Sequence, residues 1–581
     1  MAALAPSASR LGPFPDLAID DFLYGHEGPW PQPSRDHPFG QAPAIYQIPA
    51  PEWSDWQTYV GDYYLENIAQ FGVRSAAIAL KDSIENPLGY PDISDADFNT
   101  VLCEGLYSKF ISPLDAPDLV TFKEQLVDTD RYDYSKSDYS CMRVVKQVWP
   151  GEAAAASIAL IRRPKNDPGF DYEVVAIQLQ QWDSQSLRFV SSPVFTKADG
   201  EAWRIARYFV LQGAIHRINL IDHTEVHFPS DAINAITKTV LPKDNLVLKL
   251  LQPHMWLTMC VNNTVLEGQR SLINRDTWYP WSPFVAKGDE VRKLLPFGWY
   301  GSQYYAASLS PGDPSKDPYF DAPNSAYPAF VYDPIPPQIP SRYGEFLNAY
   351  FGPIRKFARG VVEQMSETDW KEVRFWADHI AVWIPGFPSG AELLGPGADG
   401  QSPNKDRLAD TLAHFIWNSS VRHSADHQTL HEMVDGKLDA NGNLLVPPRP
   451  VPFILRVAPP MTRDYGLKAA SLDSKKLSLV GDVEKVIEHL ADKTPLCWPS
   501  DMSSAHWADL LFYMPHNSRQ LCDLAATMQG DPNQNYAFEG AALTGLVAQI
   551  QSDLRALDAE LAKDPARHFV PLQEIASSIQ Y

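Results

Sequence analysis

Four histidines form two pairs with the spacing His-x-x-x-His. His223 and His227 lie in "NLIDHTEVHF", and His423 and His427 lie in "SSVRHSADHQTLH". Residues four positions apart in an α-helix are separated by about 400° of turn and about 6 Å of rise, so each pair projects from one face as neighbours. Two such helices packed face to face would place four imidazoles around one point, as in metal sites built in helical cores. Neutral imidazole binds iron, zinc, copper and manganese, so the ligand set alone does not select the metal.

A structural role for these histidines is the alternative to a metal site. Both pairs lie in strongly apolar stretches, where a buried imidazole without a partner is unfavourable, and finding two pairs together favours a metal. His216 and His431 share the same helix faces, so spacing leaves open which four of the six converge. A carboxylate-bridged pair of metal ions is disfavoured because neither stretch contains Glu-x-x-His.

The elements that must position the histidines are two long helices. Apolar residues at three- and four-residue spacing predict helices over 201–228 and 405–434, and the same pattern predicts helices at 53–72, 244–254, 343–365 and 367–380. A short β-branched run at 172–179 predicts a buried strand. Strand signals are few and early, so the predicted fold class is mainly α with a small amount of β near the N-terminal side.

The chain organisation is predicted from composition. The first 60 residues are rich in Pro and aromatic residues, which indicates an extended arm. We expect residues 1–150 to form this arm and helices that pack on the core, and residues 151–581 to form a helical metal-binding core, the whole being one continuous domain.

Composition excludes several classes of protein. A net charge of −22 over 581 residues argues against a nucleic-acid partner, because such binding relies on clustered Lys and Arg. The five cysteines are scattered and include no CxxC motif, which argues against a disulfide framework and a thiolate zinc site. No stretch reaches the roughly 18 apolar residues that a membrane-spanning helix needs. The first residues lack the apolar segment of a signal peptide, so the prediction is a cytoplasmic protein of unspecified oligomeric state.

Beyond the histidines, a series of segments resembles the lipoxygenase family from about residue 170 to the end of the chain. "VVAIQL" with "PVFTKADGEAWRIARYFV" is similar to the family's strand, Phe-Thr loop and helix opening, and Trp203 lies twenty residues before His223, as the family places its tryptophan. The remaining similar segments are "LVLKLLQPHMWLTMCVNN", "GQRSLIN", "FIWNSSVRHSADH", "PPRPVPFILR" and "IASSIQY". The resemblance implies a lipoxygenase-like helical catalytic domain, and the family's N-terminal β-sandwich is not expected.

The resemblance implies a ligand set. His223 and His227 correspond to the first two iron ligands, His423 to the third, and His427 to the family's Asn-or-His position. The main-chain carboxylate of Tyr581 would be the last ligand, which requires only that the tail inserts. Iron is the implied metal, with manganese as the lesser alternative, and His431 is expected to be structural or to lie behind the ligands.

The chain departs from the family at several positions. Three residues separate His223 from His227 where the family has four on a helix widened by a π-bulge, and we expect an ordinary α-helix here. A short insertion precedes Gly268, which corresponds to the family's Ala-or-Gly position that directs oxygen, or is a loop glycine. Leu272 corresponds to the leucine that packs on the substrate. Arg422 is charged where the family is apolar, and serves a polar substrate group or points to solvent.

The resemblance implies an enzyme that inserts O₂ into the 1,4-pentadiene of a polyunsaturated fatty acid to give a hydroperoxide. Its partners would be O₂ and an apolar unsaturated substrate, held largely by burial at about 0.8 kcal/mol per CH₂. Two alternatives stay open. The first is an enzyme of the same fold that oxidises a non-lipid metabolite or rearranges a hydroperoxide, and the second is a catalytically silent lipid-binding or zinc-binding protein.

Overall fold

The structure is a computed structural model, and it describes seven stretches of the chain together with a few short pieces. The stretches are 52–61, 93–148, 152–262, 341–393, 403–438, 518–527 and 534–581, without 167–169, 184–185 and 384–386. Gly268 and Leu272 lie outside the described residues. The expected substrate-side roles of these two residues therefore stay predictions.

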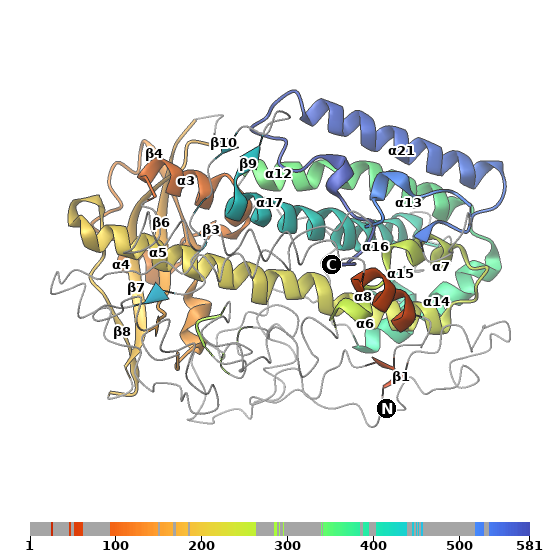
Figure 1. The fold of residues 1–581 in the computed structure, drawn as a ribbon, viewed down its shortest axis with the longest axis horizontal. Helices are drawn as coiled ribbons and strands as arrows, with labels where there is room; N and C mark the ends of the chain where they lie inside the picture. The colour runs from red at the N-terminus through yellow and green to blue at the C-terminus, as the bar shows by residue number, and fades with distance from the viewer. Residues whose placement is uncertain are drawn as a thin grey trace.

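A five-stranded antiparallel sheet lies at one end of the molecule, beside the first long helix (Figure 1). Its strands, in spatial order, are β3 (Ile111–Pro113), β4 (Tyr132–Asp138), β6 (Ala156–Pro164), β7 (Glu173–Asp183) and β8 (Arg188–Ser191). Strand β7 confirms the strand predicted at 172–179. Strands β4 and β6 pair with each other although they lie on opposite sides of the predicted boundary at residue 150. The division of the chain into residues 1–150 and 151–581 stays a prediction.

Three small two-stranded pairings complete the β-structure of the described residues. They are β1 (Gly25–His26) with β2 (Tyr46–Gln47), β5 (Glu152–Ala153) with β11 (Leu455–Arg456), and β9 (Lys437–Leu438) with β10 (Leu444–Val446). The predicted class, mainly α with a little β, is confirmed.

Each histidine pair lies on a long helix that contains a π-helical segment. The first helix runs through α5 (Glu201–Arg217), the π segment η5 (Ile218–Asp222) and α6 (His223–Val240). The second runs through α16 (Lys405–Trp417), the π segment η10 (Asn418–Arg422) and α17 (His423–Asp435). Each π segment ends one residue before the first histidine of its pair. The α-helical spacing expected between His223 and His227 is observed, because both residues lie in α6. The π segments in the turns before the two pairs were not predicted.

Hydrogen bonds from side chains to the helix backbone accompany the widened turns. The Asn219 amide donates to the Ile215 carbonyl over 2.7 Å, and the Ser419 hydroxyl donates to the Phe415 carbonyl over 2.9 Å. Such bonds to the carbonyl four residues back compete with the backbone ladder and distort a helix. An extra residue in the turn rotates everything after it, so the π segments set the direction in which the histidines point.

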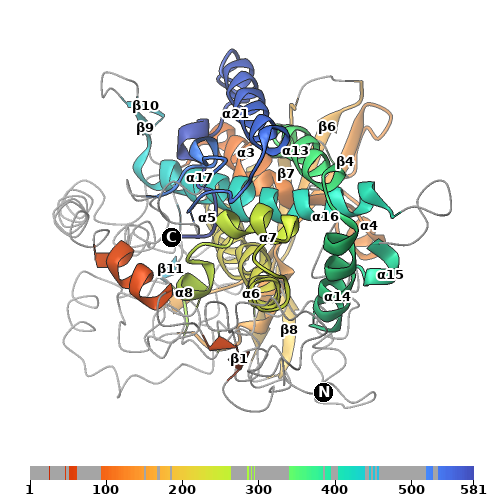
Figure 2. The ribbon, with the colours of Figure 1, turned by 90° about the vertical axis from the view of Figure 1, so that its right-hand side faces the viewer.

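The remaining helices enclose the two long ones. Helix α13 (Phe351–Glu363) packs on α16 and on α21 (Ala541–Leu561), and α14 (Glu367–Trp383) packs on α6. In Figure 1, α21, α13 and α16 lie in successive layers, and Figure 2 shows α14 beside α6. The shorter described helices include α3 (Asp95–Cys103), α4 (Ala116–Thr121), α7 (Leu246–Leu251), α8 (Thr258–Asn262), α12 (Arg342–Ala349) and α15 (Gly390–Leu393). In the part of the chain that the structure describes, no helix is both long and apolar enough to span a bilayer.

Candidate metal centre

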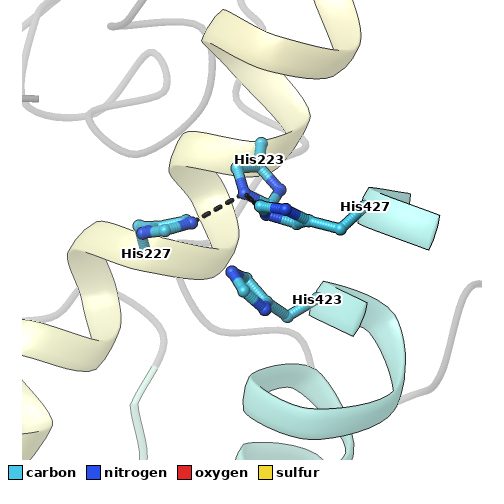
Figure 3. A group of neighbouring side chains, drawn as sticks. All are labelled: His223, His227, His423 and His427. Atoms are coloured by element: carbon cyan, nitrogen blue, oxygen red, sulfur yellow. Dashed lines mark hydrogen bonds between the residues drawn. The ribbon is translucent and has the colours of Figure 1, made fainter. Parts of the chain in front are cut away.

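The two histidine pairs converge. The ligating atoms of His223, His227, His423 and His427 all lie within 4.8 Å of one another. The Nε2 atom of His223 lies 2.7 Å from Nε2 of His227 and 2.7 Å from Nε2 of His427. Figure 3 shows the first pair reaching from one helix and the second pair from the other toward a common point. Spacing left six candidates, and the structure brings these four together.

This arrangement fits a bound transition-metal ion. With metal–nitrogen bonds of about 2.0–2.1 Å, neighbouring donors on one ion lie about 3 Å apart. The two 2.7 Å separations from His223 Nε2 are close to this value. Both ring nitrogens of His423 are buried and have no hydrogen-bond partner among the described residues. Buried polar atoms nearly always have a hydrogen-bond partner. An ion bound between the rings would explain why the His423 nitrogens have none among the described protein groups.

Burial keeps the imidazoles of His223, His227 and His423 neutral. It lowers the pKa of His227 to about 4, against a weaker opposing effect of the hydrogen bond to Asn262. Burial also holds the pKa values of His223 and His423 well below the usual range, and the neighbouring imidazoles lower both further. The neutral ring is the form that binds a metal, so the site is ready for an ion at neutral pH.

Asn262 on α8 orients one ring, and sequence reasoning gave it no role. The Asn262 amide nitrogen donates to the His227 carbonyl over 3.1 Å, so its oxygen, 2.5 Å from His227 Nδ1, accepts the ring proton. This bond fixes the tautomer and leaves the Nε2 lone pair facing the cluster. The signal was present in "TMCVNN", one of the segments that resembles the family.

Replacing Asn262 with Leu is expected to weaken metal binding about 10–100-fold, the usual range for residues that orient metal ligands. Affinity for Co²⁺ in the purified full chain measures this directly. The control is Asn234→Leu, which removes a buried amide on α6 that donates to the Met255 carbonyl. It should lower stability and leave the affinity unchanged. Equal losses of affinity in both variants would contradict the role of Asn262.

The C-terminal tail is fully inserted. Residues 575–581 are all buried, and both views place the C-terminus inside the outline of the helices (Figures 1 and 2). The Ala576 amide donates to the Ser424 hydroxyl on α17, and the Ser577 amide donates to the Arg519 carbonyl. The Tyr581 ring lies against the site, with its centroid 4.9 Å from that of His427 and 5.2 Å from that of His423. That the main-chain carboxylate of Tyr581 binds the metal ion stays a prediction.

His254 ties the tail to the core and makes it sensitive to acid. Its Nδ1–H donates to the Ser577 carbonyl over 2.7 Å, and its Nε2 accepts from the Tyr536 hydroxyl over 3.1 Å. Burial lowers the pKa of His254 to about 4. A lowered histidine pKa means that the folded state resists protonation. The stabilisation is therefore complete above the unfolded pKa of about 6.5 and is lost as the pH falls toward 4.

Replacing His254 with Gln is expected to reduce this acid sensitivity. The lowered pKa of His254 corresponds to about 3 kcal/mol of unfolding free energy, which the wild-type protein loses between about pH 6.5 and pH 4. The variant has no imidazole at this position, so its unfolding free energy should not fall by this amount. Urea unfolding at pH 7 and pH 4.5 gives the difference, and carboxylates titrate alike in both proteins. Identical pH dependence of the two unfolding free energies would rule the mechanism out.

Three other candidate residues that the structure describes, His216, His431 and Arg422, are not among the four converging histidines. The His216 ring nitrogen Nδ1 lies 2.9 Å from the Gln212 carbonyl, one turn back on α5. His431 is half-buried on α17 and lies outside the cluster of four. Arg422 is buried and ion-paired with Asp222 and Glu225, so the alternative that it points to solvent is wrong.

Comparisons with solved structures identify the fold. A manganese lipoxygenase superposes with a TM-score of 0.60 at 14% identity, covering 92% of this chain and 92% of that chain. An anaerobic structure of a lipoxygenase in complex with arachidonate gives 0.56 at 14% identity, covering 97% and 78%. A fungal lipoxygenase from Fusarium graminearum gives 0.53 at 16% identity, covering 84% and 80%. No protein-family model and no curated protein sequence matches the chain.

Proposed function

We propose that this chain, which has the lipoxygenase fold, is a non-haem iron dioxygenase acting on polyunsaturated fatty acids. It would insert O₂ into a 1,4-pentadiene and release a hydroperoxide. The observation that carries the proposal is the convergence of four buried imidazoles from two helices that each contain a π segment. The lipoxygenase fold around this donor set supports the same chemistry.

The residues that would hold the iron are His223, His227, His423, His427 and the main-chain carboxylate of Tyr581. When bound, the ion supplies one-electron oxidation of the doubly allylic methylene. Neutral imidazoles with one carboxylate compensate its charge only partly, which favours an oxidising state, and hydrogen bonds behind the ligands tune it. Manganese remains the lesser alternative, since a manganese enzyme is among the similar structures.

The protein's own groups orient the ligands and keep the site dry. Asn262 fixes the ring of His227, and Ser424 and Arg519 hold the tail that carries Tyr581. Each of the four imidazoles is at least nine-tenths buried, so bulk water is excluded from the ligand atoms. Gly268 and Leu272 are proposed to contact the substrate.

Oxygen uptake and conjugated-diene absorbance test the proposal. Protein loaded with iron is expected to consume O₂ and form a diene with linoleate and arachidonate. It should do neither with oleate, which lacks a 1,4-pentadiene. Loaded protein that consumes no O₂ with either substrate would contradict the proposal. Turnover of a supplied hydroperoxide without O₂ uptake would favour the hydroperoxide-rearranging alternative, and tightly bound zinc would favour the silent one.

A further inference from the structure

Five charged residues form a buried network beside the histidine cluster. The Arg422 guanidinium donates from Nη2 to Asp222 over 2.9 Å and to Glu225 over 3.1 Å. The Lys109 ammonium donates to the second oxygen of Asp222 over 2.5 Å and to Asp426 over 2.7 Å. The side chains are between 2% and 15% exposed. We call Lys109, Asp222, Glu225, Arg422 and Asp426 the buried charge network.

The network sits at the positions that aim the ligands. Asp222 is the last residue of η5 and precedes His223, and Arg422 is the last residue of η10 and precedes His423. Their ion pair therefore joins the ends of the two π segments. Asp426 precedes His427, so three of the four network residues on the ligand helices adjoin a ligand, and Glu225 is the fourth.

Lys109 adds a point outside both ligand helices. It lies in η2 (Leu106–Phe110), next to the sheet strand β3, and bridges Asp222 on the first helix to Asp426 on the second. One buried cation thus ties both ligand helices to the sheet end of the molecule. An ion pair and a bridging cation together restrict sliding and rotation of the helices, which a single contact would not.

Protein groups pair with most polar atoms of the network, while Arg422 Nε has no hydrogen-bond partner among the described residues. The second oxygen of Asp426 accepts from the Tyr343 hydroxyl over 2.8 Å, and Arg422 Nη1 donates to the Asn418 amide oxygen over 3.2 Å. Contacts with the protein thus occupy both terminal nitrogens of Arg422. Buried ion pairs are often no more stabilising than apolar packing, and their best-attested use is to fix one arrangement of helices.

We propose that the buried charge network sets the rotation and separation of the two ligand helices and so holds the four imidazoles converged before an ion binds. Its members are positioning residues that act through the histidines beside them. The inference rests on the metal centre of the proposed function and not on its substrate. It assigns a role to Arg422, the charge that stands where the resembling family is apolar.

Binding of Co²⁺ to the full chain tests the network without any enzymatic assay. Arg422→Met and Asp222→Asn are each expected to lower Co²⁺ affinity about 10–100-fold and to shift the ligand-field absorption of the bound ion. The double variant should lose less affinity than the sum of the two single variants, because both changes remove the ion pair between Arg422 and Asp222. Arg422→Lys, which restores the charge, should recover part of the affinity.

The matched control is Lys238→Met, which removes another buried cation on α6 that pairs with Glu52 over 3.2 Å. It should lower the unfolding temperature while leaving Co²⁺ affinity and absorption as in the wild type. Equal loss of affinity in the control would show that general stability governs binding, and would overturn the inference. Wild-type affinity and absorption in Arg422→Met and Asp222→Asn would overturn it too. A wild-type chain that binds no Co²⁺, iron or manganese would overturn the metal centre as well.

Discussion

Replacing His423 with alanine is expected to abolish metal-dependent stabilisation of the protein. His423 has two buried ring nitrogens without hydrogen-bond partners among the described residues, so binding an ion is the interaction that its removal eliminates. Loss of a ligand should weaken metal binding more than about 100-fold, beyond the range for residues that only orient ligands. Oxygen uptake with linoleate should fall below detection for the same reason.

Thermal or urea unfolding with and without metal measures how much metal binding raises the free energy of unfolding of each protein. At a metal concentration of about 100 times the wild-type dissociation constant, binding stabilises the wild type by about 2.7 kcal/mol. A variant with about 100-fold weaker binding gains only about 0.4 kcal/mol under the same conditions. The metal-free variant should itself be less stable, because a fully buried ring that packs against Tyr581 is lost. The quantity to compare is therefore the gain in unfolding free energy that each protein shows when metal is added.

His431→Ala is the matched control, since His431 lies one turn beyond His427 on the same helix. It should keep the full metal-dependent stabilisation and the oxygen uptake. If His431→Ala loses both and His423→Ala keeps both, the choice of four histidines among six is wrong.

The ligand pairs could be predicted because their geometry is local. Four-residue spacing on a helix fixes two side chains on one face whatever the helix packs against. The two long helices were predicted for the same reason, from apolar periodicity within each segment. The meeting of both pairs at one point depends on tertiary packing. It was expected only because the order of the segments resembles that of the lipoxygenase family.

The π segments could not be predicted from spacing alone. They coincide with bonds from Asn219 and Ser419 to carbonyls one turn back, and Asn and Ser make the same bonds in unwidened helices. Strands β4 and β6 were missed for a different reason. The sequence of β4, "YDYSKSD", has no apolar run, and its place in the sheet comes from pairing with β3 and β6.

Contacts between residues far apart in the sequence could not be predicted either. Arg422 was recognisable as a charge in an apolar context, but Lys109 lies 113 residues before Asp222 and 317 residues before Asp426. Asn262 lies 35 residues from His227. Nothing in the composition around Lys109 distinguishes it from a surface lysine, so the buried charge network became visible only in three dimensions.

Deleting Tyr581 is expected to weaken metal binding more than about 100-fold, past the range for residues that only orient ligands. The tail is held by Ser424, Arg519 and His254, whose partners are Ala576 and Ser577. These anchors fix the position of the tail, so under the proposed function a shortened tail would carry its carboxylate one residue short of the proposed iron site. Adding one glycine after Tyr581 should also weaken metal binding. The extra residue moves the carboxylate by up to about 3.8 Å, and it needs space in a region that is fully buried.

Tyr581→Ile separates the carboxylate from the side chain. It keeps the chain length and gives up only the ring contacts with His423 and His427, worth about 0.5–1.5 kcal/mol each for aromatic pairs. The two contacts together correspond to about 1–3 kcal/mol, which should appear as a lower free energy of unfolding. Because the carboxylate stays in place, we expect Tyr581→Ile to bind Co²⁺ within about tenfold of the wild type and to keep its oxygen uptake. If deletion and extension of the tail leave Co²⁺ affinity intact while Tyr581→Ile destroys it, the aromatic ring and not the carboxylate completes the site.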